Sequence, residues 1–444
     1  MQRTVQSKAR NEELPPDAPA RVAALHILLR WLADGDFPDR SLRTVVRDRP
    51  LVTEMVLGAV RRYAQLMWAL EERCKRRPEP EIVAAFLVGA NELLFLDNVK
   101  AHAAVFETVE AVKPLVHPEA TAFLNALLRR ISVERDSILQ ALPRQPDPIR
   151  LSHPYFLIRR WNALFGETKM RRLCEWNNGR PDLCLHPSRL RTDLRTYQRR
   201  LADHGITSTP HPFAPEAFLI LGPETPPVER LPGFEEGAFT IQDPATSISV
   251  DLLNPKPGER LLDACASPGG KTALIAERME GRGELISMDL HEDRMVRLRE
   301  NIARLGLQGV RPVKADASRL TLPRLRELNL PADGFDGILL DVPCSNTGVI
   351  RRRPDARWRV NAELLARLQR AQEGLLQAAA GLLKPGGRIV YSTCSLETEE
   401  NEGRVGNWVS KNPEFRKEQA QKTFPPDTGC DGAYAARIRR TGPA

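Results

Sequence analysis

Leu262-Asp263-Ala264-Cys265-Ala266-Ser267-Pro268-Gly269-Gly270-Lys271-Thr272 is the stretch that decides the fold. It predicts a buried strand that ends at Asp263, a tight glycine turn and the start of a helix. Glycine has no Cβ, so Gly269 and Gly270 let the backbone approach a ligand closely, and the free N–H groups of a helix start attract a carboxylate or phosphate. The spacing excludes a Walker A loop, because Cys265 stands where its first glycine would be, and it excludes a G-x-G-x-x-G turn.

Short apolar runs alternate with helical stretches around this turn. Such alternation is typical of a parallel sheet with helices on both faces, so we predict an α/β, Rossmann-like domain over residues 241–444. Strands are expected at residues 260–263, 284–289, 310–316, 335–341 and 388–392, and helices at Thr272–Met279, Glu292–Leu305 and Ala362–Leu383.

Two acidic residues close the next two predicted strands. Asp289 follows Gly270 by 19 residues, and an acid at that place can accept both hydroxyls of a ribose. Asp316 closes the third strand, where an adenine amino group could meet it. A single strand-end Asp often only caps the following helix. The ordered set above a glycine turn nevertheless favours an adenosyl ligand.

Residues 18–142 have helical periodicity, with apolar residues at helical spacing from Val22 to Leu32 and from Val56 to Leu70. They predict an all-α domain. The segment Leu142–Pro148 holds three prolines and predicts a linker or domain edge. Residues 150–240 are expected to form a small α+β connecting domain.

Charge is distributed unevenly along the chain. The 444 residues carry a net charge of +8, and residues 151–200 hold 11 basic against 4 acidic side chains. Five arginines also lie between positions 351 and 359. Clustered arginine is typical of a protein that binds a polyanion. A solvated surface in an arginine-rich chain is the alternative, and charge alone leaves both open.

The composition argues against several classes of protein. Apolar residues make up 42% of the chain, which is enough for packed cores. No apolar run approaches the roughly 18 residues of a membrane helix, and Met1–Ala20 lacks the apolar segment of a secretory signal. Seven widely spaced cysteines without a C-x-x-C pair argue against a disulfide framework and a zinc site. We therefore expect a cytoplasmic protein with no membrane segment and no metal.

Two further segments place a cysteine just after a predicted strand. They read Asp341-Val342-Pro343-Cys344-Ser345-Asn346-Thr347-Gly348 and Tyr391-Ser392-Thr393-Cys394-Ser395-Leu396, and the second is followed by Glu399-Glu400-Asn401-Glu402. With the glycine turn they resemble RNA 5-methylcytosine methyltransferases of the Nop2/Sun/RsmB family. The segments Leu94–Asp97, Ala101–Val105 and Asn125–Arg130 resemble the NusB-like RNA-binding domain of its ribosomal small-subunit methyltransferase B type. The resemblance spans residue 18 to the C-terminus.

The resemblance implies three domains and a cofactor. The domains are an all-α NusB-like domain at 18–142, a small α+β connecting domain at 150–240 and a Rossmann-like S-adenosylmethionine-dependent methyltransferase domain at 241–444. We interpret the Cys265 thiol itself as a packing group. The residues expected to bind S-adenosylmethionine are Cys265, Ala266, Ser267, Pro268, Gly269, Gly270, Lys271, Asp289, Asp316 and Asp341.

The resemblance also assigns the chemistry to two cysteines. Carbon 5 of cytosine is a poor nucleophile, and thiolate attack at carbon 6 turns it into an enamine-like, reactive carbon. The family pattern makes Cys394 the attacking thiol and lets Cys344 help to release the product. Asp341 would bind the cytosine edge, with Lys271 near both cofactor and target. In DNA 5-methylcytosine enzymes the Pro-Cys cysteine attacks, so Cys344 is the alternative nucleophile.

The substrate implied is a cytosine in 16S ribosomal RNA, in an unassembled or partly assembled small subunit, modified by a monomeric enzyme. The expected RNA-binding residues are Arg351, Arg352, Arg353 and Arg357. The alternatives are a cytosine-C5 methyltransferase for tRNA or another RNA, and a non-catalytic NusB-like RNA-binding or assembly factor. No role is assigned to Gln242-Asp243, nor to Asp431-Gly432-Ala433-Tyr434, which lacks the first of two usual aromatic residues.

Overall fold

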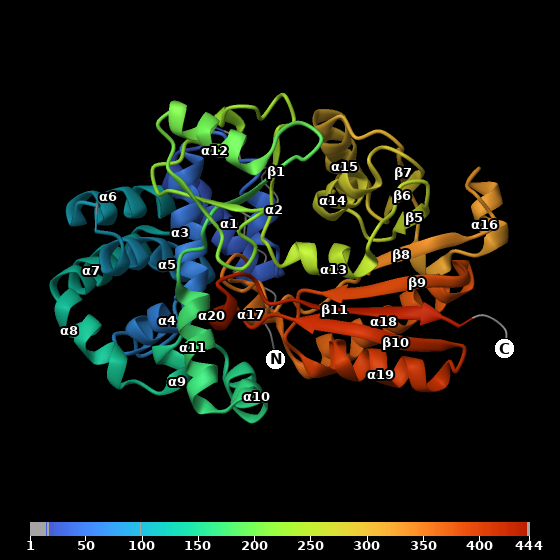
Figure 1. The fold of residues 1–444 in the computed structure, drawn as a ribbon. Helices are drawn as coiled ribbons and strands as arrows, with labels where there is room; N and C mark the ends of the chain where they lie inside the picture. Colours follow the sequence, from blue (N-terminus) through green and yellow to red (C-terminus); the bar gives the residue numbers. More distant parts are fainter. Residues whose placement is uncertain (1–14, 16, 98, 442–444) are drawn as a thin grey trace. The chain divides into compact units, whose positions relative to one another are not determined.

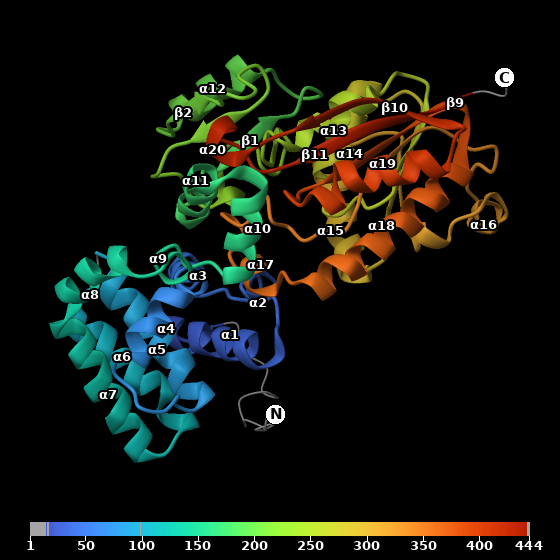
Figure 2. The same ribbon diagram turned by 90° about the horizontal axis from the view of Figure 1, so that it is seen from below.

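The computed structural model describes residues 15, 17–97 and 99–441. Most of the polar start of the chain, for which no secretory signal is expected, and the last three residues of the expected catalytic domain lie outside the described residues. The chain divides into two compact units, shown as ribbons in Figures 1 and 2. The first unit runs to Gly179 and includes Ile350–Arg359, and the second comprises Arg180–Val349 and the residues from Val360 onward. No helix in the described part of the chain is long and apolar enough to cross a membrane.

In the described residues of the first unit the regular elements are all helices, as predicted for its N-terminal part. At its centre lies α5 (Pro80–Phe95), in which every residue from Glu81 to Leu94 is buried, as expected of a helix that is apolar on all sides. The helices that contact it most are α1 (Ala20–Asp34), α3 (Arg49–Arg61), α6 (Ala101–Val112) and α7 (Pro118–Val133). The unit is completed by α2 (Pro38–Ser41), α4 (Tyr63–Glu71), α8 (Arg135–Ala141), α9 (Asp147–Arg150), α10 (Tyr155–Phe165), α11 (Glu167–Asn178), α17 (Ala356–Arg359) and the 3-10 turns η2 (Lys113–Leu115) and η3 (Leu142–Arg144).

Arg357 is a buried residue of the first unit. Its side chain is fully buried, and its guanidinium donates to the Ser152 carbonyl at 2.9 Å, the Asn177 carbonyl at 3.0 Å and Asn178 Oδ1 at 2.6 Å. Burial lowers its pKa to about 9. Because all of these acceptors belong to the protein, the expectation that Arg357 contacts RNA is corrected. The arginine instead fixes the segment Ile350–Arg359 to the residues around α11. The boundary between the two units lies at Gly179, and therefore within the residues 150–240 that were expected to form the connecting domain.

The second unit begins with a small antiparallel sheet in the order β2-β3-β1-β4. Leu185, Leu219 and Phe239 are buried beneath α12, with Tyr197 and Leu201 of that helix. The sheet comprises β1 (Cys184–Pro187), β2 (Ser208–Pro210), β3 (Leu219–Leu221) and β4 (Phe239–Ile241), and the segments between them form α12 (Leu194–Asp203) and the 3-10 turn η4 (Val228–Arg230).

A seven-stranded sheet in the order β10-β11-β9-β8-β5-β6-β7 forms the rest of the second unit. The five predicted strands are confirmed and pair in parallel. They are β5 (Arg260–Asp263), β6 (Glu284–Asp289), β7 (Val310–Lys314), β8 (Phe335–Asp341) and β9 (Leu383–Thr393). Two further antiparallel strands, β10 (Phe415–Lys422) and β11 (Tyr434–Arg440), extend the sheet beyond β9. The predicted α/β, Rossmann-like class is confirmed.

Helices cover both faces of this sheet because successive strand residues point to opposite sides. Leu261 and Leu339 pack in one cluster with α13 (Thr246–Leu253) and α14 (Gly270–Met279). Leu262 and Ile338 pack in another with α16 (Leu322–Glu327), α18 (Ala362–Leu382) and α19 (Glu402–Lys411). The remaining elements are α15 (Glu292–Leu305), α20 (Pro425–Thr428) and the 3-10 turns η5 (Ala317–Arg319) and η6 (Thr398–Glu400).

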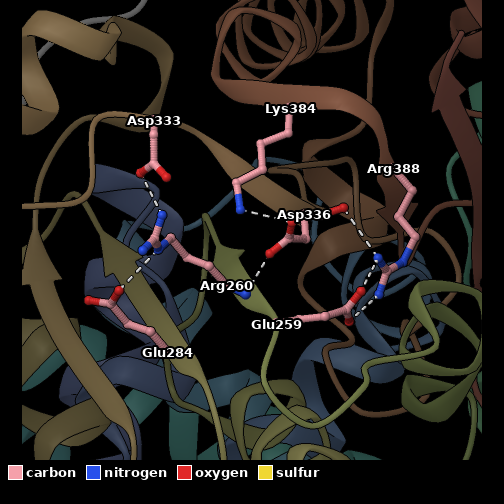
Figure 3. A network of polar contacts seen from close by, with 7 residues as sticks. All are labelled: Glu259, Arg260, Glu284, Asp333, Asp336, Lys384 and Arg388. Carbon is pink, nitrogen blue, oxygen red and sulfur yellow. Dashed lines mark hydrogen bonds and ion pairs between the residues drawn. The ribbon is translucent and has the colours of Figure 1, made fainter. Parts of the chain in front are cut away.

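Charged residues tie the strands together near the amino ends of β5, β6 and β8 (Figure 3). Arg388 binds both Glu259 oxygens at 2.7 Å and the Asp336 carbonyl at 3.2 Å. Arg260 binds Glu284 at 3.2 Å and donates its backbone N–H to Asp336 at 2.8 Å. A buried charge is stable only when it is paired and hydrogen-bonded, as Arg388 is. This network holds the strands in register at the edge away from their carboxyl ends.

Candidate active site

The strand order points to the carboxyl edge of β5 and β8 as the place for a ligand. The chain leaves β5 toward β6 and β7 on one side and returns to β8 and β9 on the other. Open parallel sheets bind ligands at such a switch point. Asp263, Asp289 and Asp341 close β5, β6 and β8 there.

The glycine turn after β5 is crowded at its two glycines. Gly269 has φ +106°, a left-handed conformation, and a Cβ on it would lie 3.0 Å from Leu298 Cδ1. A Cβ on Gly270 would lie 3.1 Å from Gln242 Oε1. The Ala266 N–H donates to the Met288 carbonyl at 2.7 Å and joins the turn to β6. Gln242, to which the sequence assigned no role, therefore lies beside the glycine turn.

Asp289, one of the residues expected to hold the cofactor, closes β6. It is 5% exposed, and its Oδ1 accepts the His291 N–H at 3.2 Å. Its Oδ2 lies 4.0 Å from Arg294 Nη1, beyond hydrogen-bond distance, so this oxygen can accept a ligand hydroxyl.

Asp316 and Cys265, two more of the residues expected to hold the cofactor, contact other residues of the protein. Asp316 accepts the Ser318 N–H at 3.0 Å and the Ser318 hydroxyl at 2.6 Å, and so caps η5. Cys265 packs against the apolar cluster beneath the sheet, and burial raises the pKa of its thiol above the usual value. The thiol is therefore protonated and acts as a packing group.

Asp263 is a fully buried acid that the predicted site did not include. Its Oδ2 accepts the Thr272 hydroxyl at 2.7 Å, and burial raises its pKa to about 7. The bond joins the end of β5 to the first turn of α14, across the glycine turn.

Lys271 and Asp341 form an ion pair between the glycine turn and the end of β8. Lys271 Nζ lies 2.6 Å from Asp341 Oδ2, and the Ser392 hydroxyl donates to Asp341 Oδ1 at 3.2 Å. Burial alone would lower the pKa of Lys271, but the charge and the hydrogen bond of Asp341 raise it above its usual value. The ammonium group therefore stays charged.

The two cysteines singled out in the sequence meet at this edge. Cys344 Sγ and Cys394 Sγ are 3.3 Å apart, since they follow the adjacent parallel strands β8 and β9. Cys344 is buried, and the hydrogen bond to Cys394, followed by burial, raises its pKa well above the usual value. Cys394 is half-buried. The pair is thus asymmetric, with one protonated thiol inside and one more accessible thiol.

Asn346 is a site residue that the sequence reasoning missed. The Cys394 thiol donates to Asn346 Oδ1 at 3.1 Å, while Asn346 Nδ2 donates to the Cys344 carbonyl at 3.1 Å. Its φ of +60° turns the loop sharply. Asn adopts this conformation more readily than most residues. The Asn between Ser345 and Thr347 was therefore the feature of the sequence that could have indicated a sharp turn here.

The two segments to which the sequence assigned no role, Gln242-Asp243 and Asp431–Tyr434, help to hold the loop that carries Cys344. Gly348 donates its N–H to the Cys394 carbonyl at 2.9 Å and accepts the Gly432 N–H at 2.8 Å. A Cβ on Gly348 would lie 2.2 Å from the Gly432 carbonyl oxygen, so the two backbones touch. Asp243 Oδ1 accepts the Asp431 N–H at 3.0 Å. Both segments therefore position the loop that carries Cys344.

The three other expected RNA-binding arginines belong to the first unit, with the segment Ile350–Arg359. The Arg351 guanidinium lies over the Trp176 ring, 4.1 Å from its centre. Arg353 is exposed and Arg352 is partly exposed. Unlike Arg357, these two side chains reach the surface.

The chain is similar to known protein families along most of its length. Three family models match: the NusB family at residues 18–133, the RsmF/B-like ferredoxin-like domain at 153–226 and the 16S rRNA methyltransferase RsmB/F at 250–439. A solved methyltransferase homolog protein from Pyrococcus horikoshii is 28% identical, with a TM-score of 0.57, and covers 66% of this chain and 97% of its own.

Two curated relatives match nearly the whole chain. The ribosomal RNA small subunit methyltransferase B of Salmonella paratyphi B is 32% identical over 90% of this chain and 92% of its own. That of Vibrio cholerae is 34% identical over 89% of this chain and 90% of its own. With these family matches and these two relatives, the chain belongs to the RsmB/F family of ribosomal RNA small subunit methyltransferases.

Proposed function

We propose that this protein methylates carbon 5 of a cytosine in 16S ribosomal RNA through a covalent cysteine adduct, with S-adenosylmethionine as methyl donor. The observation that carries the proposal is the pair of thiols, 3.3 Å apart, beside the Lys271–Asp341 ion pair. Methylation of a base nitrogen or a ribose oxygen needs no thiol nucleophile. Two cysteines at adjacent strand ends therefore favour carbon as the methyl acceptor.

The residues around the glycine turn suit the cofactor. The crowded turn at Gly269 and Gly270 brings backbone close to a ligand, and Asp289 offers an acceptor to a ribose. Ala266, Ser267 and Pro268 shape the same turn, and Asp316 lies at the end of the neighbouring strand. When bound, S-adenosylmethionine supplies an electrophilic methyl group on a sulfonium. Lys271 and Asp341 would border the site on the side of the thiols.

The cysteines convert a poor nucleophile into a good one. The Cys394 thiolate bonds to carbon 6 of cytosine, and the electron pair of the 5,6 double bond shifts so that carbon 5 can attack the methyl group. Asp341 binds the cytosine edge by accepting from its amino group, and the Lys271 ammonium paired with Asp341 balances the negative charge that develops on the ring. Loss of the carbon 5 proton then restores the double bond as the bond from carbon 6 to sulfur breaks. The thiolate returns to its starting state.

The asymmetry of the two thiols supports Cys394 as the nucleophile. Only the thiolate attacks, and the raised pKa of Cys344 keeps that thiol protonated. Cys394 is the more accessible of the two, and the Lys271 ammonium would attract a thiolate at that position. A flipped-out base therefore meets Cys394 first.

The substrate is tested by bisulfite sequencing of total RNA from cells that lack this protein. We expect one 5-methylcytosine to disappear from 16S ribosomal RNA and to return when the wild-type gene is restored. tRNA sequenced from the same cells is the control. A loss confined to tRNA would make the chain a tRNA enzyme, and an unchanged pattern in both RNAs would exclude the proposed reaction.

Arg352 and Arg353 are proposed to contact RNA phosphates. Each phosphate contact releases counterions, so each charge reversal, Arg352→Glu or Arg353→Glu, should lower the slope of log affinity against log salt by roughly 1. Filter binding at several salt concentrations measures this, with Arg416→Glu on the exposed edge strand β10 as control. An unchanged slope in both variants would assign these arginines to a solvated surface. Arg351 is left out because it also packs on Trp176.

A further inference from the structure

Glu400, at the end of η6, is a fully buried acid among residues of the two cysteine loops. Its carboxylate accepts the Ser345 N–H at 3.0 Å, the Ser395 hydroxyl at 2.6 Å and the Gln372 side-chain amide at 2.9 Å. The Ser345 hydroxyl also donates to it. A buried carboxylate without partners is costly, and these four donors compensate it.

The donors belong to the residues that flank the cysteines. Ser345 follows Cys344 and Ser395 follows Cys394, so one carboxylate holds both loops. The two serine hydroxyls also lie 3.0 Å apart. Gln372 of α18, which is fully buried as well, donates to the Pro343 carbonyl at 3.0 Å, directly before Cys344. The loop with Cys344 is therefore fixed from both sides of the cysteine.

We propose that Glu400 is a positioning residue that holds the loops of Cys344 and Cys394 in register, so that the two thiols meet. The consequence for methyl transfer rests on the proposed function, whereas the effect on the distance between the thiols does not. Glu400 touches neither thiol and acts through Ser345 and Ser395.

The charge of Glu400 supports the same role. It is one of the groups that raise the pKa of Cys344, after the hydrogen bond to Cys394 and burial. Loss of the carboxylate would thus loosen both loops and also weaken the electrostatic difference between the thiols.

Oxidation by diamide tests the distance between the thiols without any RNA. Diamide takes two electrons and two protons from Cys344 and Cys394, which forms one S–S bond and reduces diamide to its hydrazine. The rate follows from mass spectrometry of the linked peptides, in the full-length protein. We expect fast linkage in the wild type and linkage at least about tenfold slower in Glu400→Ala, because a shift of about 1 Å can cost a factor of 10² in reactions between fixed groups.

Glu400→Gln is the conservative variant. Its amide oxygen can still accept from Ser345 and Gln372, and its NH₂ group can donate to the Ser395 hydroxyl, which is able to turn round. The rate of disulfide formation should therefore lie between that of the wild type and that of Glu400→Ala. The matched control is Glu402→Gln, two residues away, because Glu402 pairs with Lys422 at the surface at 2.7 Å. It should link at the wild-type rate.

Methyl transfer gives a second measurement. In Glu400→Ala, kcat should fall by about 10²-fold while KM for RNA and cofactor binding stay as in the wild type. If a folded Glu400→Ala protein forms the disulfide at the wild-type rate, the positioning role is overturned. If that variant does not fold, the double variant Ser345→Ala Ser395→Ala decides in the same way. Normal linkage in a wild-type protein that methylates no RNA would refute the proposed function and leave the role of Glu400 intact.

Discussion

Replacement of Cys394 by alanine is expected to lower methyl transfer by a factor of about 10⁴ or more, because without the covalent bond carbon 5 of cytosine stays a poor nucleophile. Binding of cofactor and RNA should be unchanged, since the side chain lost is small and lies at the surface of the site. Single-turnover transfer of a labelled methyl group to 16S ribosomal RNA measures the effect.

Cys430→Ala is the matched control for this variant. Cys430 is a buried thiol of the same unit, and burial raises its pKa to about 12, so that it cannot act as a nucleophile. We expect Cys430→Ala to keep the wild-type rate per folded molecule. Methyl transfer near the wild-type rate in Cys394→Ala would refute the assignment of the nucleophile.

The core of the catalytic domain was predictable because its signals are local. Buried parallel strands appear as short apolar runs, and the glycine pair after Asp263 marks the turn into α14. The five parallel strands and the helices α14, α15 and α18 were therefore predicted, whereas the short helices α16 and α17 were not. β10 was not predicted. It reads Phe415-Arg-Lys-Glu-Gln-Ala-Gln-Lys422, and all but its first residue are partly or fully exposed, as is usual for an edge strand that carries charges.

The rest of the site depends on contacts between distant parts of the chain. Arg357 follows Cys344 by 13 residues and looks like its neighbouring arginines in the sequence, yet its acceptors come from residues 152, 177 and 178. Glu400 stands between Glu399 and Glu402 in the sequence, and only the structure shows that it is buried while these two neighbours are partly exposed. Periodicity cannot find such pairs, because it reports which face is apolar and not which residue meets which.

Replacement of Cys344 by alanine is expected to stop the reaction after methyl transfer. The adduct still needs a base to remove the carbon 5 proton, and a positioned base contributes about 10² to 10⁴ in rate. In the free protein the hydrogen bond to Cys394, ahead of burial, holds the pKa of Cys344 well above its usual value. Once Cys394 is bonded to carbon 6 it carries no charge and no proton, so the first of these causes is removed.

The Cys344→Ala protein should therefore accumulate a covalent complex with RNA that survives denaturation, visible as a band of lower mobility after electrophoresis in detergent. The double variant Cys344→Ala Cys394→Ala should form no such complex, because the attacking thiol is then missing. A stable complex in Cys394→Ala, together with none in Cys344→Ala, would exchange the two roles and make Cys344 the nucleophile. The comparison decides between the two thiols because the 3.3 Å between their sulfur atoms lets either one reach the same cytosine carbon.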